Sequence, residues 1–239
     1  MLGTYLNAAA IILGAILGLS LRRQLSAAAQ NYLKLTLGCV TIFFGMKLVW
    51  TGLNGSFWQV ARQFTIALLA LMLGRLVGRL LHLQKLSNRL GRQARDDIAN
   101  TAGHVPPWTE GFNTCSALFC ATPLAVIGSI SDGLGDYFQP LLIKAAIDGL
   151  AAFGFVSLFR WSVLLSAIPV FVYQGTLTLL CLRYGRPFLE ARGLLDSVVV
   201  TEGLLLVFVS LVIFEVRRIE LADYLPALAL APLLASLWH

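Results

Sequence analysis

Apolar residues dominate this chain in runs that are separated by short polar connectors. Most runs are close to the ~20 residues with which an α-helix crosses the hydrocarbon core of a bilayer. Eight such segments are expected, at residues 5–21, 34–51, 57–83, 111–130, 141–158, 161–182, 198–214 and 222–238. The pattern therefore predicts an all-α integral membrane protein with seven or eight transmembrane helices.

The fourth and fifth segments differ from the others because their facing ends are polar and contain glycine. Residues 129–149 carry three acids, one lysine and three glycines between two apolar stretches. Charge at membrane depth is costly and usually marks a pathway or a site, and glycine lets the backbone bend there. These two segments are therefore either full spans or a central broken-helix or re-entrant pair.

The polar connectors divide the chain into four parts. We expect an N-terminal unit of three spans (1–83), a cytoplasmic amphipathic connector (84–110), a central polar helix pair (111–159) and a C-terminal unit of three spans (160–239). Both outer units have a basic connector of about a dozen residues between their first two spans. With two spans between them, the units would run in opposite directions, as in inverted repeats of secondary transporters.

Charge sets the class of protein and its orientation. Only 13% of the residues are charged, about half the usual share, which excludes a water-soluble fold. The net charge of +6 does not indicate nucleic-acid binding, because the basic residues flank the spans. The basic groups after the first and third segments place those connectors in the cytoplasm and the N-terminus outside. The connector with Arg183, Arg186 and Arg192 would then lie outside, which conflicts with the same rule.

Two aspartates in the central region are candidates for an ion site. Asp132 and Asp136 are four residues apart, and on one helix their like charges would be destabilising. With two glycines between them, the sequence favours an irregular loop. Together with Ser129 and Ser131, that loop would offer oxygen ligands for Na⁺, Ca²⁺ or a proton relay. The alternative is an ordinary turn at the membrane surface.

Five further polar residues lie within apolar segments. Lys144 and Asp148 have opposite signs and fall one helical turn apart, about 6 Å along the axis. They form either a static ion pair or a pair that exchanges partners when a ligand binds. The amides of Asn7 and Gln174 either bind a polar ligand or join helices by hydrogen bonds. Glu202 is a candidate for proton or cation binding, or the partner of an arginine elsewhere.

The sequence gives no positive sign of catalysis. It contains no Walker loop, dinucleotide fingerprint, HExxH motif or nucleophile elbow. Its four cysteines and three histidines do not have metal-ligand spacing. We expect a protein that is not an enzyme and has no cofactor, with Na⁺ as a candidate coupling ion at Asp132 and Ser129.

Several motifs resemble one family of bacterial membrane proteins. They are Met1-Leu-Gly-Thr-Tyr-Leu-Asn-Ala8, Ala125-Val-Ile-Gly-Ser-Ile-Ser-Asp-Gly-Leu134, Lys144-Ala-Ala-Ile-Asp-Gly149, Tyr173-Gln-Gly175 and Leu225-Pro-Ala-Leu-Ala-Leu-Ala-Pro-Leu-Leu-Ala235. In this order they resemble the YqgA/YdfK-type family, which is functionally unassigned and has been suggested to be a Na⁺ channel or pump. The resemblance implies a multi-pass protein of the bacterial inner membrane. Cys120-Ala-Thr-Pro123 departs from the family pattern, and its proline implies a bend in the fourth segment.

The favoured function is secondary transport of a small polar solute, coupled to Na⁺ or H⁺. One alternative is a cation channel lined by the same acids. Another is a structural or regulatory membrane protein acting through the basic region 84–110. The expected partners are the lipid bilayer, a small solute or ion and a second copy of the chain, since Gly14-x-x-x-Gly18 and Gly74-x-x-x-Gly78 allow close helix approach.

Overall fold

The computed structural model describes the chain except residues 22–25, 101–107, 136, 217–218 and 239. Its described residues form helices and turns, with no strands among them. The elements are α1 (Leu2–Leu21), α2 (Ala27–Gly52), α3 (Phe57–Leu80), α4 (Leu83–Asn100), α5 (Trp108–Cys120), α6 (Pro123–Leu134), α7 (Gln139–Phe159), α8 (Ser162–Leu165), α9 (Ala167–Leu180), the π-helix η1 (Cys181–Gly185), α10 (Arg186–Glu190), α11 (Leu195–Ile213), the 3₁₀-helix η2 (Leu221–Tyr224) and α12 (Ala227–Leu237). The expectation of an all-α protein is confirmed.

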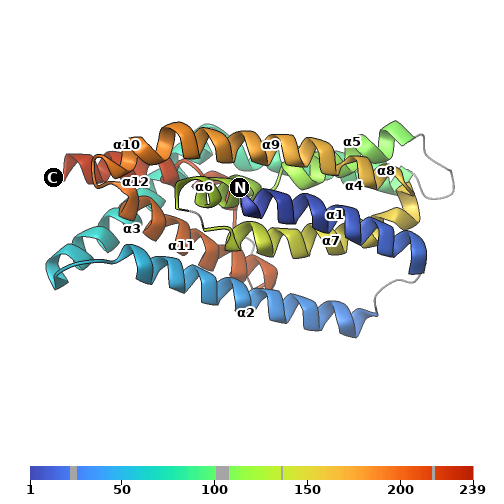
Figure 1. The fold of residues 1–239 in the computed structure, drawn as a ribbon, viewed down its shortest axis with the longest axis horizontal. Coiled ribbons are helices and arrows are strands. Elements are labelled where there is room, and N and C mark those ends of the chain that lie inside the picture. The colour runs from blue at the N-terminus through green and yellow to red at the C-terminus, as the bar shows by residue number, and fades with distance from the viewer. Residues whose placement is uncertain (22–25, 101–107, 136, 217–218, 239) are drawn as a thin grey trace.

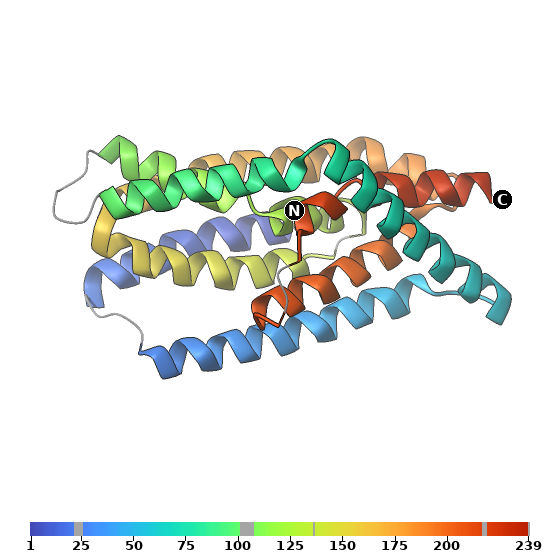
Figure 2. The ribbon, with the colours of Figure 1, turned by 180° about the vertical axis from the view of Figure 1, so that it is seen from behind.

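Most helices run roughly along the long axis of an elongated bundle (Figure 1). The most extensive contacts join α1 to α7 and α2 to α11, and α3 packs against α12. The short α6 lies in the middle and contacts α7 and α9, while α9 also packs along α1. Figure 2 shows the opposite side, where α4 lies beside α5. Segments from both ends of the sequence therefore surround α6 and α7.

Glycine allows the two largest helix contacts to form. A Cβ at Gly14 on α1 would collide with the backbone carbonyl of Gly149 on α7. A Cβ at Gly203 on α11 would lie 2.7 Å from the carbonyl oxygen of Gly45 on α2. Small residues let membrane helices approach until their backbones touch, which increases van der Waals contact. The Gly14-x-x-x-Gly18 motif is thus used within the chain, with Gly18 packed against Phe153 and Val156.

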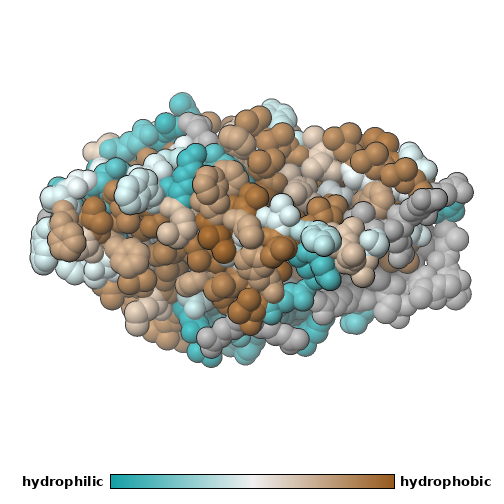
Figure 3. Space-filling view, turned by 90° about the horizontal axis from the view of Figure 1, so that it is seen from below, coloured by the Kyte–Doolittle hydropathy of each residue, from teal (hydrophilic) through white to brown (hydrophobic). Residues whose placement is uncertain are grey.

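Length and composition make this a multi-pass membrane protein. Among the described residues, six helical segments are long and apolar enough to cross a membrane. The number of candidate spans rises to seven if α5 and α6, which are bent by 60° at their junction, form one span. Mainly hydrophobic residues cover the middle of the face in Figure 3, as a lipid-facing surface requires. The predicted seven or eight spans thus agree with the structure at the lower number.

Two predicted segments need correction. The third does not continue to residue 83, because α3 ends at Leu80 and His82 adopts a positive φ of 56° before α4 begins. The eighth is not one regular span, because η2 is followed by an α12 of only 11 residues with Pro232 inside it. At 1.5 Å per residue α12 is about 16 Å long, roughly half the hydrocarbon thickness.

The amphipathic connector is a helix that docks on the C-terminal unit. The backbone N–H of Gln84 donates to Asp223 Oδ1 at 2.8 Å, and Gln84 Oε1 accepts from the N–H of Ala222 at 3.0 Å. The Asp223 carboxylate thus satisfies an orphan donor in the first turn of α4. This contact fixes the start of α4, while residues 101–107 of the connector lie outside the described residues.

Candidate functional site

A buried ion pair lies on α7 in the centre of the bundle. Lys144 Nζ is 2.5 Å from Asp148 Oδ2, and the side chains are 1% and 4% exposed. Pro140 at the start of α7 is compatible with the first helical turn, and the four-residue spacing then brings the two groups together. Each charge compensates the other where water cannot. The ion pair expected from the sequence is present.

Two amides from other helices complete this site. Asn7 on α1 donates through Nδ2 to Asp148 Oδ2 and to Gln174 Oε1 on α9, both at 3.1 Å. Asn7 and Gln174 are both fully buried. We call Asn7, Lys144, Asp148 and Gln174 the central polar cluster. It joins α1, α7 and α9, which are up to 167 residues apart in the sequence.

The central polar cluster has two unused hydrogen-bonding atoms. Asn7 Oδ1 is an acceptor and Gln174 Nε2 is a donor, and neither has a partner among the described residues. A buried polar group without a partner costs about 1–3 kcal/mol. A ligand that brings both a donor and an acceptor would satisfy the two amides. The cluster thus combines a paired cation and anion with free amide groups, the chemistry needed to hold a small polar molecule.

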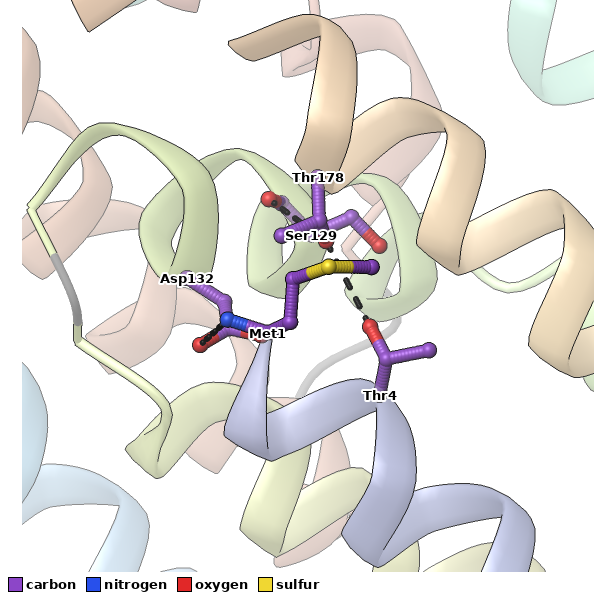
Figure 4. Close-up of polar contacts among 5 residues, drawn as sticks. All are labelled: Met1, Thr4, Ser129, Asp132 and Thr178. Atoms are coloured by element: carbon purple, nitrogen blue, oxygen red, sulfur yellow. Dashed lines mark hydrogen bonds and ion pairs between the residues drawn. The ribbon is translucent and has the colours of Figure 1, made fainter. Parts of the chain in front are cut away.

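A second set of polar contacts continues from this cluster towards α6. Thr4 Oγ1 lies 3.4 Å from Thr178 Oγ1, which donates to the carbonyl oxygen of Ser129 at 3.2 Å (Figure 4). One turn along α6, Asp132 Oδ1 lies 3.3 Å from the amino group of Met1. Ser129 Oγ and Asp132 Oδ2 are buried without a partner among the described residues. Ser129 and Asp132 are the two residues predicted as sodium ligands.

The Ser129–Asp132 stretch corrects one prediction. These residues do not form an irregular loop, because α6 runs from Pro123 to Leu134 and ends at Gly135. Gly133 lies against the carbonyl of Thr178, where a Cβ would be 2.5 Å from the oxygen. That glycine therefore serves helix packing rather than chain bending. Asp136, the other predicted acid, lies outside the described residues.

Glu202 on α11 forms a separate buried site. Its Oε2 accepts from Ser131 Oγ at 2.8 Å, while Oε1 has no partner among the described residues and the residue is 1% exposed. The alternative that Glu202 pairs with an arginine is wrong for the described residues, since its partner is Ser131. An unpaired buried carboxylate is strongly disfavoured in its charged form. The site is suited to hold a proton.

The structure therefore distributes the predicted residues over two sides of α6. Ser129 and Asp132 face α1 and α9, whereas Ser131 faces Glu202 on α11.

Tyr137 lies just after α6, where burial and then the charge of Asp196 raise the pKa of its phenol. That phenol remains a neutral donor at the α6–α7 junction. No group of three His, Cys, Asp or Glu side chains suited to a metal occurs in the described ranges.

Sequence reasoning missed the two threonines that connect the sites. Thr4 precedes Asn7 by three residues, so both lie on one face of α1, and Thr178 follows Gln174 by four residues on α9. That spacing was a usable signal. Threonine hydroxyls in membrane helices are, however, common donors to their own backbone, as Thr41 is to Leu37 here. Their role became visible only when α1 and α9 were placed side by side.

The fold and its buried charges define a multi-pass α-helical membrane protein with an internal polar site. The chain belongs to the family described as "Protein of unknown function (DUF554)", which matches residues 2–236. It is 22% identical over 243 residues to "Uncharacterized membrane protein YdfK" of Bacillus subtilis, covering all of this chain and 97% of that protein. It is 25% identical over 248 residues to "Uncharacterized protein YqgA" of Escherichia coli, with the same coverage. No solved structure matches this chain. The resemblance drawn from the sequence motifs is confirmed.

Proposed function

We propose that this protein is a secondary transporter for a small polar solute, coupled to Na⁺ or H⁺. The observation that carries the proposal is the central polar cluster, in which a buried Lys144–Asp148 pair and two amides with unused atoms meet between three helices. Ionisable groups inside a membrane protein are rare and usually serve transport. Neither an enzyme activity nor a cofactor is part of this proposal.

The solute would bind by exchanging partners with the ion pair. A carboxylate of the solute would replace Asp148 at Lys144, or an ammonium would replace Lys144 at Asp148. The free Asn7 Oδ1 and Gln174 Nε2 would then pair with other polar groups of the solute. Because every buried charge must keep a partner, exchange of this kind favours solutes that carry charge and hydrogen-bonding groups together.

Two sites are suited to the coupling ion. The unpartnered oxygens of Asp132 and Ser129 favour Na⁺, which prefers oxygen ligands. The Ser131–Glu202 contact favours H⁺, because Glu202 has no basic partner in the described part of the chain. Both sites include residues of α6, so binding at either one would change the packing of that helix against α9 or α11.

The packing of the outer helices supports an inverted-repeat arrangement. Helices α1, α2 and α3 contact α9, α11 and α12, respectively, and the two helices of each pair run in opposite directions (Figures 1 and 2). Each pair joins the segments that the sequence pattern treats as equivalent. Rocking of one unit against the other around α6 and α7 would give alternating access.

The proposed location is the bacterial inner membrane with the N-terminus outside. In this orientation α1 and α7 end at the cytoplasmic side, where Arg160 follows α7. The basic connector after α9 would face outside. Its charge is partly compensated, since Arg186 Nε is 2.8 Å from Glu190 Oε1 and Arg192 lies over the ring of Phe188. A second copy of the chain is part of the proposal, although the glycine motifs of α1 and α3 pack within the chain.

Sodium binding can be tested by thermal unfolding of the detergent-purified protein at rising NaCl, with choline chloride holding ionic strength constant. We expect a saturable, Na⁺-specific stabilisation of the wild type, of about 2.7 kcal/mol at ~100 times the Kd. Asp132→Asn should abolish it, and the exposed-site control Asp96→Asn should retain it. Absence of a Na⁺ effect in the wild type would remove sodium and leave H⁺ as the coupling ion.

Transport itself can be tested with purified protein in liposomes under an imposed Na⁺ or pH gradient. Uptake of a panel of amino acids and other small charged solutes should saturate and depend on the gradient, and Asp148→Asn should abolish it. Flux that neither saturates nor needs a counter-ion would favour the channel alternative. If Asp148→Asn is harmless in cells while deletion of 88–100 removes the phenotype, the regulatory alternative would be favoured.

A further inference from the structure

A large groove lies away from the central polar cluster, near the end of the bundle where α1 and α7 end and α2 begins (Figure 1). Its volume is about 1170 Å³. It opens between α2 and α7, and residues at the C-terminal end of α11 close one side of it. The groove exists because α11 ends at Ile213, before it has covered the full length of α2.

The walls of the groove are apolar over most of its length. They include Leu33 and Leu37 from α2, Leu150, Phe153 and Phe155 from α7, and Ile213 from α11. Gly154 leaves extra room, because a Cβ built there would meet no atom within 4 Å. Such a surface suits an acyl chain, which packs against it without losing hydrogen bonds to water.

One end of the groove carries positive charge. Lys34 Nζ is 2.5 Å from Glu215 Oε1, so these two charges offset each other. Arg160, just after α7, also lines the groove, is exposed and has no ion-pair partner among the described residues. Among the lining residues that the structure describes, the net charge at this end is therefore that of a guanidinium, which binds phosphate oxygens through two parallel hydrogen bonds.

We propose that this groove binds one anionic phospholipid, with its phosphate at Arg160 and an acyl chain along the α2–α7 wall. An apolar groove that ends at Arg160, which has no ion-pair partner within the described ranges, matches a lipid with a negatively charged headgroup in both shape and charge. Basic pockets between transmembrane helices are suited to such headgroups. The site is separate from the proposed transport site and does not depend on the direction or coupling of transport.

Native mass spectrometry of the detergent-purified protein tests the charge requirement. Phosphatidylglycerol and phosphatidylcholine with the same acyl chains would be added in turn, and retained lipids counted. We expect one retained phosphatidylglycerol per chain in preference to phosphatidylcholine. Arg160→Ala should weaken its retention about fivefold, since one arginine near a lipid surface contributes about 1 kcal/mol. The matched control Arg89→Ala, an exposed arginine on α4, should leave retention unchanged.

A second pair of variants tests the apolar part. Gly154→Trp should fill the groove and lower retention of phosphatidylglycerol, while Gly91→Trp, at another open helical glycine, should not. Wild-type melting temperatures and elution volumes would verify that both variants fold. Equal retention of the two lipids, or equal loss with Arg89→Ala, would overturn the proposal. The proposal would also be overturned if inorganic phosphate alone protected the protein against thermal unfolding. A wild-type dimer that Gly154→Trp converts to monomers without a change in lipid retention would overturn it as well.

Discussion

At the scale of single residues, the main feature is that three buried acids each have a different kind of partner. Asp148 has a lysine and an amide, Asp132 an amino group, and Glu202 a hydroxyl. A charge in a region of low dielectric is tolerated only with such compensation. The nature of each partner therefore decides which acid is held as a charge and which is suited to carry a proton.

For the Lys144–Asp148 pair, removal of one partner should be worse than removal of both. Asp148→Asn or Lys144→Met alone leaves a buried charge unpaired and should destabilise the protein by about 3–5 kcal/mol. The double variant Lys144→Met/Asp148→Leu should recover most of this stability, yet transport should remain absent. Thermal unfolding and liposome uptake measure the two effects. A double variant that transports normally would show that the pair is only structural.

For Glu202, replacement by glutamine should separate packing from proton binding. The amide oxygen of Glu202→Gln can still accept from Ser131, so stability should change by less than about 1 kcal/mol. Uptake driven by a pH gradient should be lost, because the amide does not titrate. Ser131→Ala is the matched variant, and it should cost about 1–3 kcal/mol by leaving the carboxyl without its donor. Retained pH-driven uptake in Glu202→Gln would exclude this acid as the proton site.

At the scale of elements, the bundle depends on contacts in which glycine brings two backbones together. Helix α1 lies on α7 and α2 lies on α11 with little space for side chains between them. The short α6 is held in a similar way against α9 by Gly133. The positions of the polar side chains are thus set by helix packing, and small shifts of one helix would separate Asn7 from Asp148.

Gly14→Ala should disrupt the α1–α7 contact. The new Cβ would overlap the carbonyl of Gly149, so we expect a loss of about 1–3 kcal/mol in stability. Gly154→Ala on α7 is the matched control, because its Cβ meets open space and alanine favours the helix by up to about 1 kcal/mol. Thermal unfolding in one detergent compares them. Equal melting temperatures for the two variants would argue against the close contact.

At the scale of the whole molecule, α1, α2 and α3 pack against α9, α11 and α12 around α6 and α7, and the proposal treats these two sets of helices as a first and a second unit. The central polar cluster has contributions from α1 in the first unit, α7 in the centre and α9 in the second. A site shared in this way changes when the units move relative to each other. The architecture is thus consistent with alternating access, in which the site itself remains near the middle of the membrane.

The orientation of the whole molecule can be tested by cysteine labelling. In a variant with its four cysteines changed to alanine, Arg192→Cys should react with an impermeant maleimide in intact cells, because the connector after α10 would face outside in the proposed orientation. Asn88→Cys on α4 should react only after permeabilisation. Both residues are exposed. The reverse pattern would place the N-terminus in the cytoplasm and would require a new account of the basic connectors.

The sequence by itself determined the membrane class, most of the spans and the family. Runs of about twenty apolar residues have few other folded solutions, since every backbone group in lipid must be satisfied within its own helix. The Lys144–Asp148 pair was also predictable, because both residues lie on one helix and the spacing fixes their separation. The same local logic failed for Ser129–Asp132, where contact of Gly133 with α9 allows a helix that the glycines alone disfavoured.

Only the tertiary structure decided which distant residues meet. Asn7, Asp148 and Gln174 lie on three helices, and the order of hydrophobic segments does not specify which helices touch. Their association depends on complementary surfaces of small residues and on buried polar groups that must find partners. The same is true of the groove at Arg160, which exists because α11 ends before α2 does. Helix formation is a local property of the chain, whereas the sites arise from packing between helices.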